Sequence, residues 1–165
     1  MSTGVEQITN PQPSGSLAAR KRQMVDRLLA FIHSPSRNHL ILSNGCLDGL
    51  KYTDVGFEVS CFIADIIGDR RLSMRTQDYI NKLFREHIFL SDYLGRYLAV
   101  TNVGILFEPL LKLDVETLLN RWSQNNTLLL DVGNGILNKN IYYLSKDCKD
   151  AFSVPLESIN YLVLT

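Results

Sequence analysis

Three short apolar runs constrain the fold of this chain more than any other feature of its sequence. They are HLILSNG at 39–45, RYLAVTN at 96–102 and TLLLDVGNG at 127–135. Each is apolar at consecutive positions, which is typical of a strand buried on both faces. Because amphipathic helical patterns lie between the runs, the sequence predicts an α/β fold with a mostly parallel sheet flanked by helices.

The helical patterns have recognisable ends. The first begins near Ser16 and should stop before Ser34-Pro35, because proline disfavours helix in the residue before it. Residues 74–89 and 113–124 also have helical spacing, and Asp114 is a plausible N-cap of the latter. Residues 55–68 are expected to begin as a strand and pass into a short helix, whereas 140–144 and 159–164 are expected to be late strands.

Length and composition suit one domain. The 165 residues have zero formal net charge, so they provide no general attraction to nucleic acid or acidic membranes. Residues 1–16 are polar and rich in Pro, Gly, Ser and Thr, so we expect a flexible tail followed by a single domain at 17–165. No apolar run approaches the length of a membrane span, and the three cysteines have no metal or disulfide spacing. A cytoplasmic protein with reduced thiols is therefore expected.

A phosphate-binding loop would be expected after the first apolar run, at the carboxyl end of a strand. The motif is G-x-x-x-x-G-K-[ST], and the corresponding residues are GCLDGLKY at 45–52. Gly45 and Lys51 have the correct interval. However, Leu50 replaces the second glycine and should crowd the phosphate, while Tyr52 replaces the magnesium-binding hydroxyl. The residues after Lys51 also do not start a helix, so the loop is degenerate.

The acidic partner of such a loop is missing as well. A nucleotide hydrolase of this kind ends a second strand with an aspartate that holds magnesium. Here that strand ends in Thr101 and Asn102, and Glu108 lies too far along the chain. The remaining carboxylates, Asp131 among them, have no metal-ligand spacing and are interpreted as caps or surface charges.

Residues 100–135 resemble the BrxF-like small P-loop proteins of bacteriophage-exclusion (BREX) defence systems. The likeness covers about the last two thirds of the chain and is weaker between Val55 and Ile88. The matching positions are Ile105, Leu106, Phe107, Glu108 and Pro109, then Ser123, Asn125 and Thr127, then Asn134 and Gly135. In this resemblance Thr101 occupies the Walker B aspartate position and Gly104 that of the following glutamate. Asn134 corresponds to a sensor asparagine.

The resemblance implies a P-loop NTPase-like fold with a degenerate nucleotide site and a role in antiviral defence. Its implied partners are a large P-loop ATPase, a DNA methyltransferase and a phosphatase-like protein. The leading hypothesis is therefore a non-catalytic pseudo-NTPase that acts by protein–protein interaction, without a cofactor.

Two alternatives remain open. In the first, the chain binds ATP and magnesium as a sensor or ATPase through Gly45, Lys51 and Asn134, with Thr53 or Thr101 on the metal. In the second, it is a DNA-binding adaptor, or reaches DNA through its complex. The candidate interaction residues are Arg20, Arg22, Arg70 and Arg71, extended for DNA by Lys21, Arg27 and Arg75.

Overall fold

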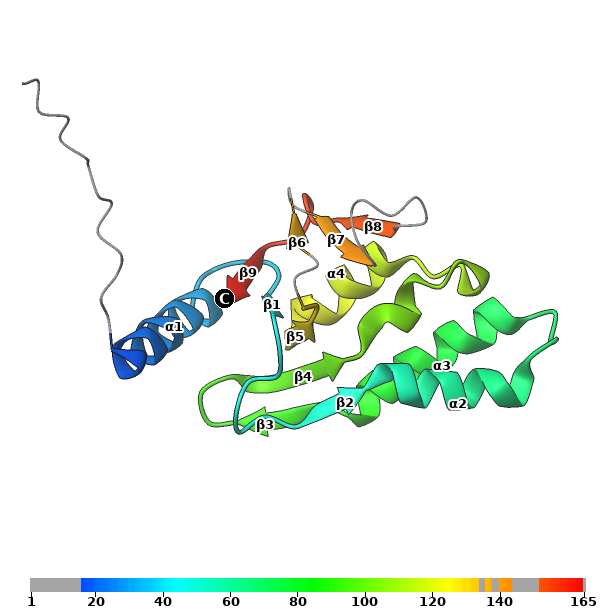
Figure 1. Ribbon diagram of the computed structural model, residues 1–165, viewed down its shortest axis with the longest axis horizontal. Helices are drawn as coiled ribbons and strands as arrows, with labels where there is room; N and C mark the ends of the chain where they lie inside the picture. Colours follow the sequence, from blue (N-terminus) through cyan, green and yellow to red (C-terminus); the bar gives the residue numbers. More distant parts are fainter. Residues whose placement is uncertain (1–15, 134–135, 138–139, 144–151, 165) are drawn as a thin grey trace, which may run out of the picture.

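The structure, a computed structural model, describes residues 16–133, 136–137, 140–143 and 152–164 (Figure 1). Residues 1–15 of the predicted tail at 1–16 and the predicted sensor residue Asn134 lie outside these residues. The side chains of 134–153 are also outside the description.

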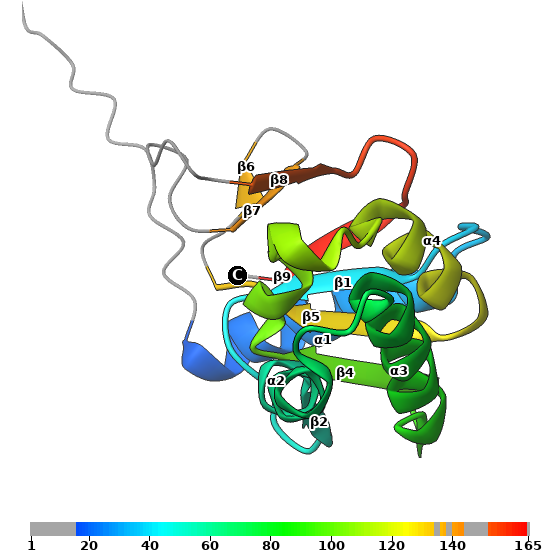
Figure 2. The same ribbon diagram turned by 90° about the vertical axis from the view of Figure 1, so that its right-hand side faces the viewer.

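The main sheet has the strand order β2-β4-β5-β1-β9, with β3 paired to β4. The parallel strands are β1 (Leu40–Ser43), β2 (Tyr52–Asp54), β4 (Gly95–Thr101), β5 (Thr127–Asp131) and β9 (Tyr161–Leu164). Among the described strands of this sheet, only β3 (Phe89–Ser91) is antiparallel. The three apolar runs are thus the neighbouring strands β4, β5 and β1, as the sequence predicted, and Figure 2 shows the order from β9 at the top to β2 at the bottom.

A second, antiparallel sheet lies above the main one (Figure 2). It consists of β6 (Ile136–Leu137), β7 (Asn140–Tyr143) and β8 (Phe152–Pro155). The expected strand at 140–144 is therefore present, but it belongs to this small sheet, because it pairs with β6 and β8 instead of the parallel strands.

Helices cover both faces of the main sheet. Alternate residues of the central strands point to opposite faces, so Leu40 and Leu42 pack in one cluster and Ile41 and Leu129 in another. The first face is covered by α2 (Val55–Ile66), α3 (Leu72–Glu86), α4 (Val115–Asn125) and the 3₁₀ helix η1 (Val103–Phe107). The second is covered by α1 (Leu17–Ile32) and by the chain between β1 and β2. A further 3₁₀ helix, η2 (Pro109–Leu111), precedes α4.

Two expected boundaries were wrong. Residues 55–68 do not begin as a strand, because Asp54 caps a helix there and its Oδ1 accepts a hydrogen bond from Phe57 N at 2.9 Å. The strand β2 comes before this helix, and its last residue, Asp54, is the cap. The helix expected over 74–89 ends at Glu86, and Phe89 belongs to β3, where pairing with Tyr97 replaces the helical hydrogen bonds. Among the described helices, none combines the length and apolar character needed to span a membrane.

The predicted cap of α4 is confirmed and supplies a measurable stability effect. Asp114 Oδ1 accepts from Thr117 N at 3.1 Å, and this backbone hydrogen bond holds the pKa of Asp114 below its usual value of 3.8. We expect Asp114→Ala to lower the free energy of unfolding at pH 7 by about 1 kcal/mol. Because the folded-state pKa is depressed, the stabilisation is present at neutral pH and disappears as the pH falls through the lowered pKa.

Urea denaturation of both proteins between pH 7 and pH 2.5 measures this difference. The exposed Asp78, which lies within α3, provides the control, since Asp78→Ala should change stability by less than about 0.5 kcal/mol. A difference between Asp114→Ala and wild type that stays constant down to the lowest pH would contradict the assignment.

Candidate functional site

The carboxyl edge of the parallel sheet is where an α/β protein binds its ligands. β1, β4 and β5 end there at Ser43, Thr101 and Asp131. From β1 the chain crosses to β2 at one edge of the sheet, and from β5 it crosses to β9 at the opposite edge. The carboxyl end of β1 therefore lies at a topological switch point.

Asp131 is the centre of this edge. Its Oδ1 accepts hydrogen bonds from the backbone N–H groups of Gly45 at 2.8 Å and Gly133 at 3.3 Å. Its Oδ2 accepts from Thr101 Oγ1 at 3.0 Å and has the thiol of Cys46 at 3.9 Å. The half-buried carboxylate thus joins the ends of three neighbouring strands. Asp131 accepts backbone N–H groups as a cap does, but its bonds to Gly45 and Thr101 also connect separate strands, which its interpretation as a cap or surface charge did not predict.

Gly45 lies at the carboxyl end of β1, as the motif analysis expected. Its φ is +94°, a conformation that other residues rarely adopt, and Ser43 Oγ donates to its carbonyl oxygen at 2.8 Å. The turn therefore aims the Gly45 N–H at the edge of the sheet. In a working phosphate loop such an N–H would face phosphate, whereas here it faces the Asp131 carboxylate.

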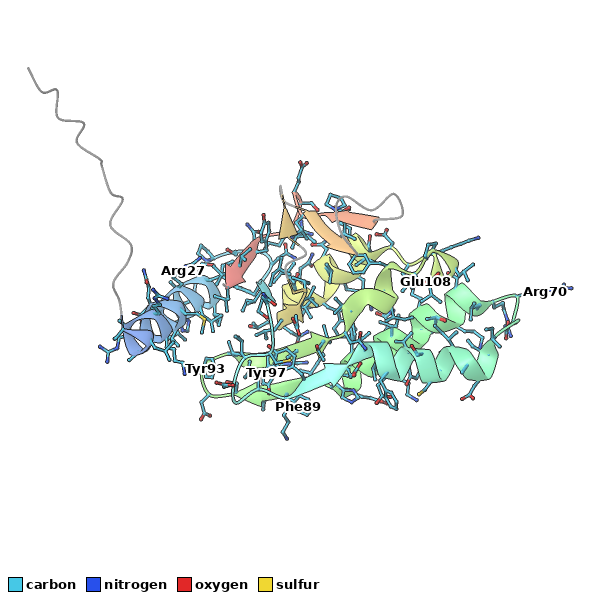
Figure 3. All side chains as sticks on the ribbon, in the orientation of Figure 1. Arg27, Arg70, Phe89, Tyr93, Tyr97 and Glu108 are labelled. Carbon is cyan, nitrogen blue, oxygen red and sulfur yellow. The ribbon has the colours of Figure 1, made fainter. Side chains whose placement is uncertain are left out.

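Lys51 does not lie with Gly45. Its backbone N–H donates to the Tyr97 hydroxyl at 3.0 Å, and its Nζ lies 5.1 Å from the centre of the Phe89 ring. Tyr97 is in the first half of β4, and Figure 3 shows it near Phe89. The lysine therefore contacts β3 and the early part of β4, and its interval from Gly45 carries no phosphate-loop geometry.

The chain between these two residues runs over the second face of the sheet. Leu47 and Leu50 pack there against the cluster around Ile41, and the Tyr52 hydroxyl accepts from Leu47 N at 3.0 Å. Burial raises the pKa of Tyr52, so its hydroxyl stays protonated at neutral pH. The prediction that Leu50 crowds the phosphate position was wrong, because its side chain is part of this apolar layer and not of the carboxyl edge.

Asn102 forms a second polar contact at the same edge. It has a left-handed conformation, with φ +56°, and its Nδ2 donates to Asp54 Oδ1 at 3.1 Å. This contact needs Gly56, since a Cβ there would lie 2.8 Å from the Asn102 carbonyl oxygen and closer still to its side chain. The asparagine was noted in the sequence only as a non-acidic residue, and its pairing with Asp54 depends on the three-dimensional fold.

The four arginines proposed for interaction do not form one surface. Arg20 and Arg22 lie on α1, whereas Arg70 and Arg71 lie in the turn between α2 and α3. These regions are at opposite ends of the molecule, as the positions of α1 and of Arg70 show in Figure 3. Arg75 is already paired with Asp69 at 2.7 Å. The prediction that all these basic residues form a single DNA-binding face is therefore wrong.

A cavity of about 290 Å³ lies elsewhere, between η1, η2, the start of α4 and β8. Leu106, Phe107 and Val154 contribute its apolar lining, and Glu108 and Glu116 contribute carboxylates. Neither Gly45 nor Asp131 lines it, so this cavity is separate from the carboxyl edge.

No protein-family model, curated protein or solved structure matches this chain. Within the described residues, no three His, Cys, Asp or Glu side chains are grouped so that they could hold a metal ion. The geometry of the carboxyl edge is therefore the main source of functional information.

Proposed function

We propose that the protein is a non-catalytic binding subunit, a pseudo-NTPase that uses an α/β scaffold to dock onto a larger protein. The observation that carries this proposal is the 2.8 Å hydrogen bond from Gly45 N to Asp131 Oδ1. The Asp131 carboxylate accepts the hydrogen bond from the Gly45 N–H, so this backbone donor is not free to bind phosphate. A phosphate arriving there would meet a like charge, which costs about 4 kcal/mol at 4 Å separation near a protein surface.

Lys51 supports the same proposal. A phosphate loop uses its lysine to neutralise the nucleotide, but this lysine lies over Phe89. The Thr101 hydroxyl is engaged with Asp131, so it is not directed at a magnesium site. The resemblance of residues 100–135 to BrxF-like proteins supports an anti-phage assembly as the setting. The partner would then be a larger P-loop ATPase or a DNA methyltransferase in the cytoplasm.

The rival function is nucleotide sensing, and thermal denaturation separates the two. A ligand at a hundred times its dissociation constant stabilises the folded state by about 2.7 kcal/mol. We expect no change in melting temperature on adding millimolar ATP with magnesium. A reproducible upward shift that needs both ATP and Gly45 would contradict the pseudo-NTPase proposal.

Lys51→Ala gives an independent test. Because Lys51 is exposed and lies over Phe89, its replacement should change stability by within about 0.5 kcal/mol and leave recovery of the native complex unchanged. The measurement is the yield of co-purified partners from tagged wild type and variant, with equal folding checked by circular dichroism. Loss of function in a folded Lys51→Ala protein that still captures its partners would contradict the pseudo-NTPase proposal and support a working nucleotide site.

A further inference from the structure

The outer face of α2 has the composition of an interface. Its inner face packs on the core through Val55, Val59 and Ile63, and Phe62 stacks on Tyr79 with a centroid distance of 4.1 Å. The exposed positions are Phe57, Ser60, Cys61, Ala64 and Asp65. Only one of these is charged, whereas the solvent face of a surface helix is normally polar or charged.

Two large apolar side chains, one on α2 and one directly after it, are exposed to water. Phe57 is 62% exposed on the first turn of α2, and Ile67, directly after the helix, is 77% exposed. Glu58, the other acid on the helix, lies near Tyr79 of α3, where its charge adds to burial in raising the pKa of that hydroxyl. The outer face is therefore left with an apolar surface that another molecule could cover.

The exposed residues of α2 are spaced so that two copies of the helix can pack against each other in antiparallel orientation. Phe57 and Ala64 are seven residues apart, about 10.5 Å along a helix, and the small Ser60 and Cys61 lie midway between them. If two α2 helices pack antiparallel about a two-fold axis at Ser60 and Cys61, each Phe57 lies against the partner's Ala64. Small residues at the crossing let the helices approach closely.

Charges along the helix fit the same arrangement. Asp54 precedes α2, while Arg70 and Arg71 follow it and are exposed. Of the two acids near these arginines, Asp69 is paired with Arg75 and Asp65 lies on the outer face. In Figure 3, Arg70 extends away from the turn that joins α2 and α3. Antiparallel packing brings the acidic start of one helix toward the basic end of the other, so both ends gain opposite-charge contacts. A parallel arrangement would bring like charges together.

We propose that α2 is a homodimer interface, in which a second copy of this chain packs antiparallel on Phe57, Ser60, Cys61 and Ala64. The inference is independent of the proposed function, because it does not involve the carboxyl edge. A helix of twelve residues is about 18 Å long, so the interface is small and a dissociation constant in the micromolar range is expected.

Sedimentation velocity of the full chain under reducing conditions, from about 5 to 500 μM, tests the association over that range. We expect conversion from 18.7 kDa to twice that mass with rising concentration. Phe57→Glu should raise the dissociation constant at least about thirtyfold, as is typical for loss of a central anchor. Ala64→Glu, on the opposite half of the contact, should weaken association as well. Leu90→Glu is the matched control, since Leu90 is 81% exposed on β3, and it should leave the dimer intact.

Cys61 reports on the geometry directly. A disulfide needs Cα atoms within about 7 Å, which holds at residue 61 only if it lies near the two-fold axis. A Cys46→Ser/Cys148→Ser protein keeps Cys61 as its one cysteine, and copper-phenanthroline should convert it to a covalent dimer. The Cys61→Ser protein should give none.

Three results would overturn the proposal. One is a wild-type chain that stays monomeric at 500 μM, even if α2 is covered by another protein. Another is a dimer that persists in both folded charge variants. The third is a dimer whose Cys61 does not cross-link. If Phe57→Glu fails to fold, Ala64→Glu and the cross-link still decide.

Discussion

A protein carrying Trp122→Glu is expected to be unfolded at room temperature. Trp122 is buried in the main core, packs edge-to-face on Phe84 at 5.6 Å and donates from Nε1 to Asn81 Oδ1 at 3.0 Å. Truncation of such a side chain alone costs about 3–5 kcal/mol. An unpaired buried carboxylate adds several more, and the total reaches the whole stability of a typical domain, about 5–15 kcal/mol.

The matched variant is Trp122→Phe, which keeps the ring packing and loses the hydrogen bond. It should stay folded and lose about 1–2 kcal/mol. Near-ultraviolet circular dichroism and urea titration measure both proteins. A cooperative, native-like Trp122→Glu protein would show that α4 does not pack as described. Leu106 and Phe107 are also buried in this core, so a charge at either should act on folding before it acts on docking.

Gly56→Ala is expected to cost about 3 kcal/mol of stability. A methyl group at this position would lie 2.8 Å from the Asn102 carbonyl oxygen and closer to the Asn102 side chain. Overpacking of this kind typically costs 1–3 kcal/mol or more. Alanine is better than glycine within a helix by only about 0.5–1 kcal/mol, so the collision should decide the sign.

Asn102→Gly supplies the control for that prediction. Alone it loses an exposed hydrogen bond to Asp54 but relieves a left-handed asparagine, so its effect should be within about 1 kcal/mol. Combined with Gly56→Ala it should recover about half of the lost stability, since the backbone oxygen still interferes. Strict additivity of the two changes in urea denaturation would argue against the contact.

The sequence predicted the parts of the fold that depend on local pattern. Continuous apolar runs identified β1, β4 and β5, the onset of helical spacing placed the start of α1 near Ser16, and a side-chain cap placed that of α4 at Asp114. The start of α2 was missed because VGFEV is rich in branched and aromatic residues, which also suit strands. There the Asp54 cap decides in favour of a helix.

The carboxyl edge could be predicted only in part. Gly45 was found because its turn follows directly from the strand before it. Asp131 was not, because its hydrogen bond to Gly45 joins residues 86 positions apart. Lys51 was placed by its interval in a motif, yet the segment between Gly45 and Lys51 is held on the other face by Leu47 and Leu50. An interval in sequence specifies a site only when the chain between its ends has the required shape.

The position of β1 has a consequence for how the chain folds during synthesis. β1 is flanked by β5 and β9, and Leu40 pairs with Leu128 and Tyr161. Both sides of this apolar strand therefore stay unpaired until about 90 further residues have been made. At roughly 5–20 residues per second that delay is about 4–18 s. Long-range parallel pairing also slows folding once the chain is complete, so the nascent chain should depend on chaperones that bind short apolar segments.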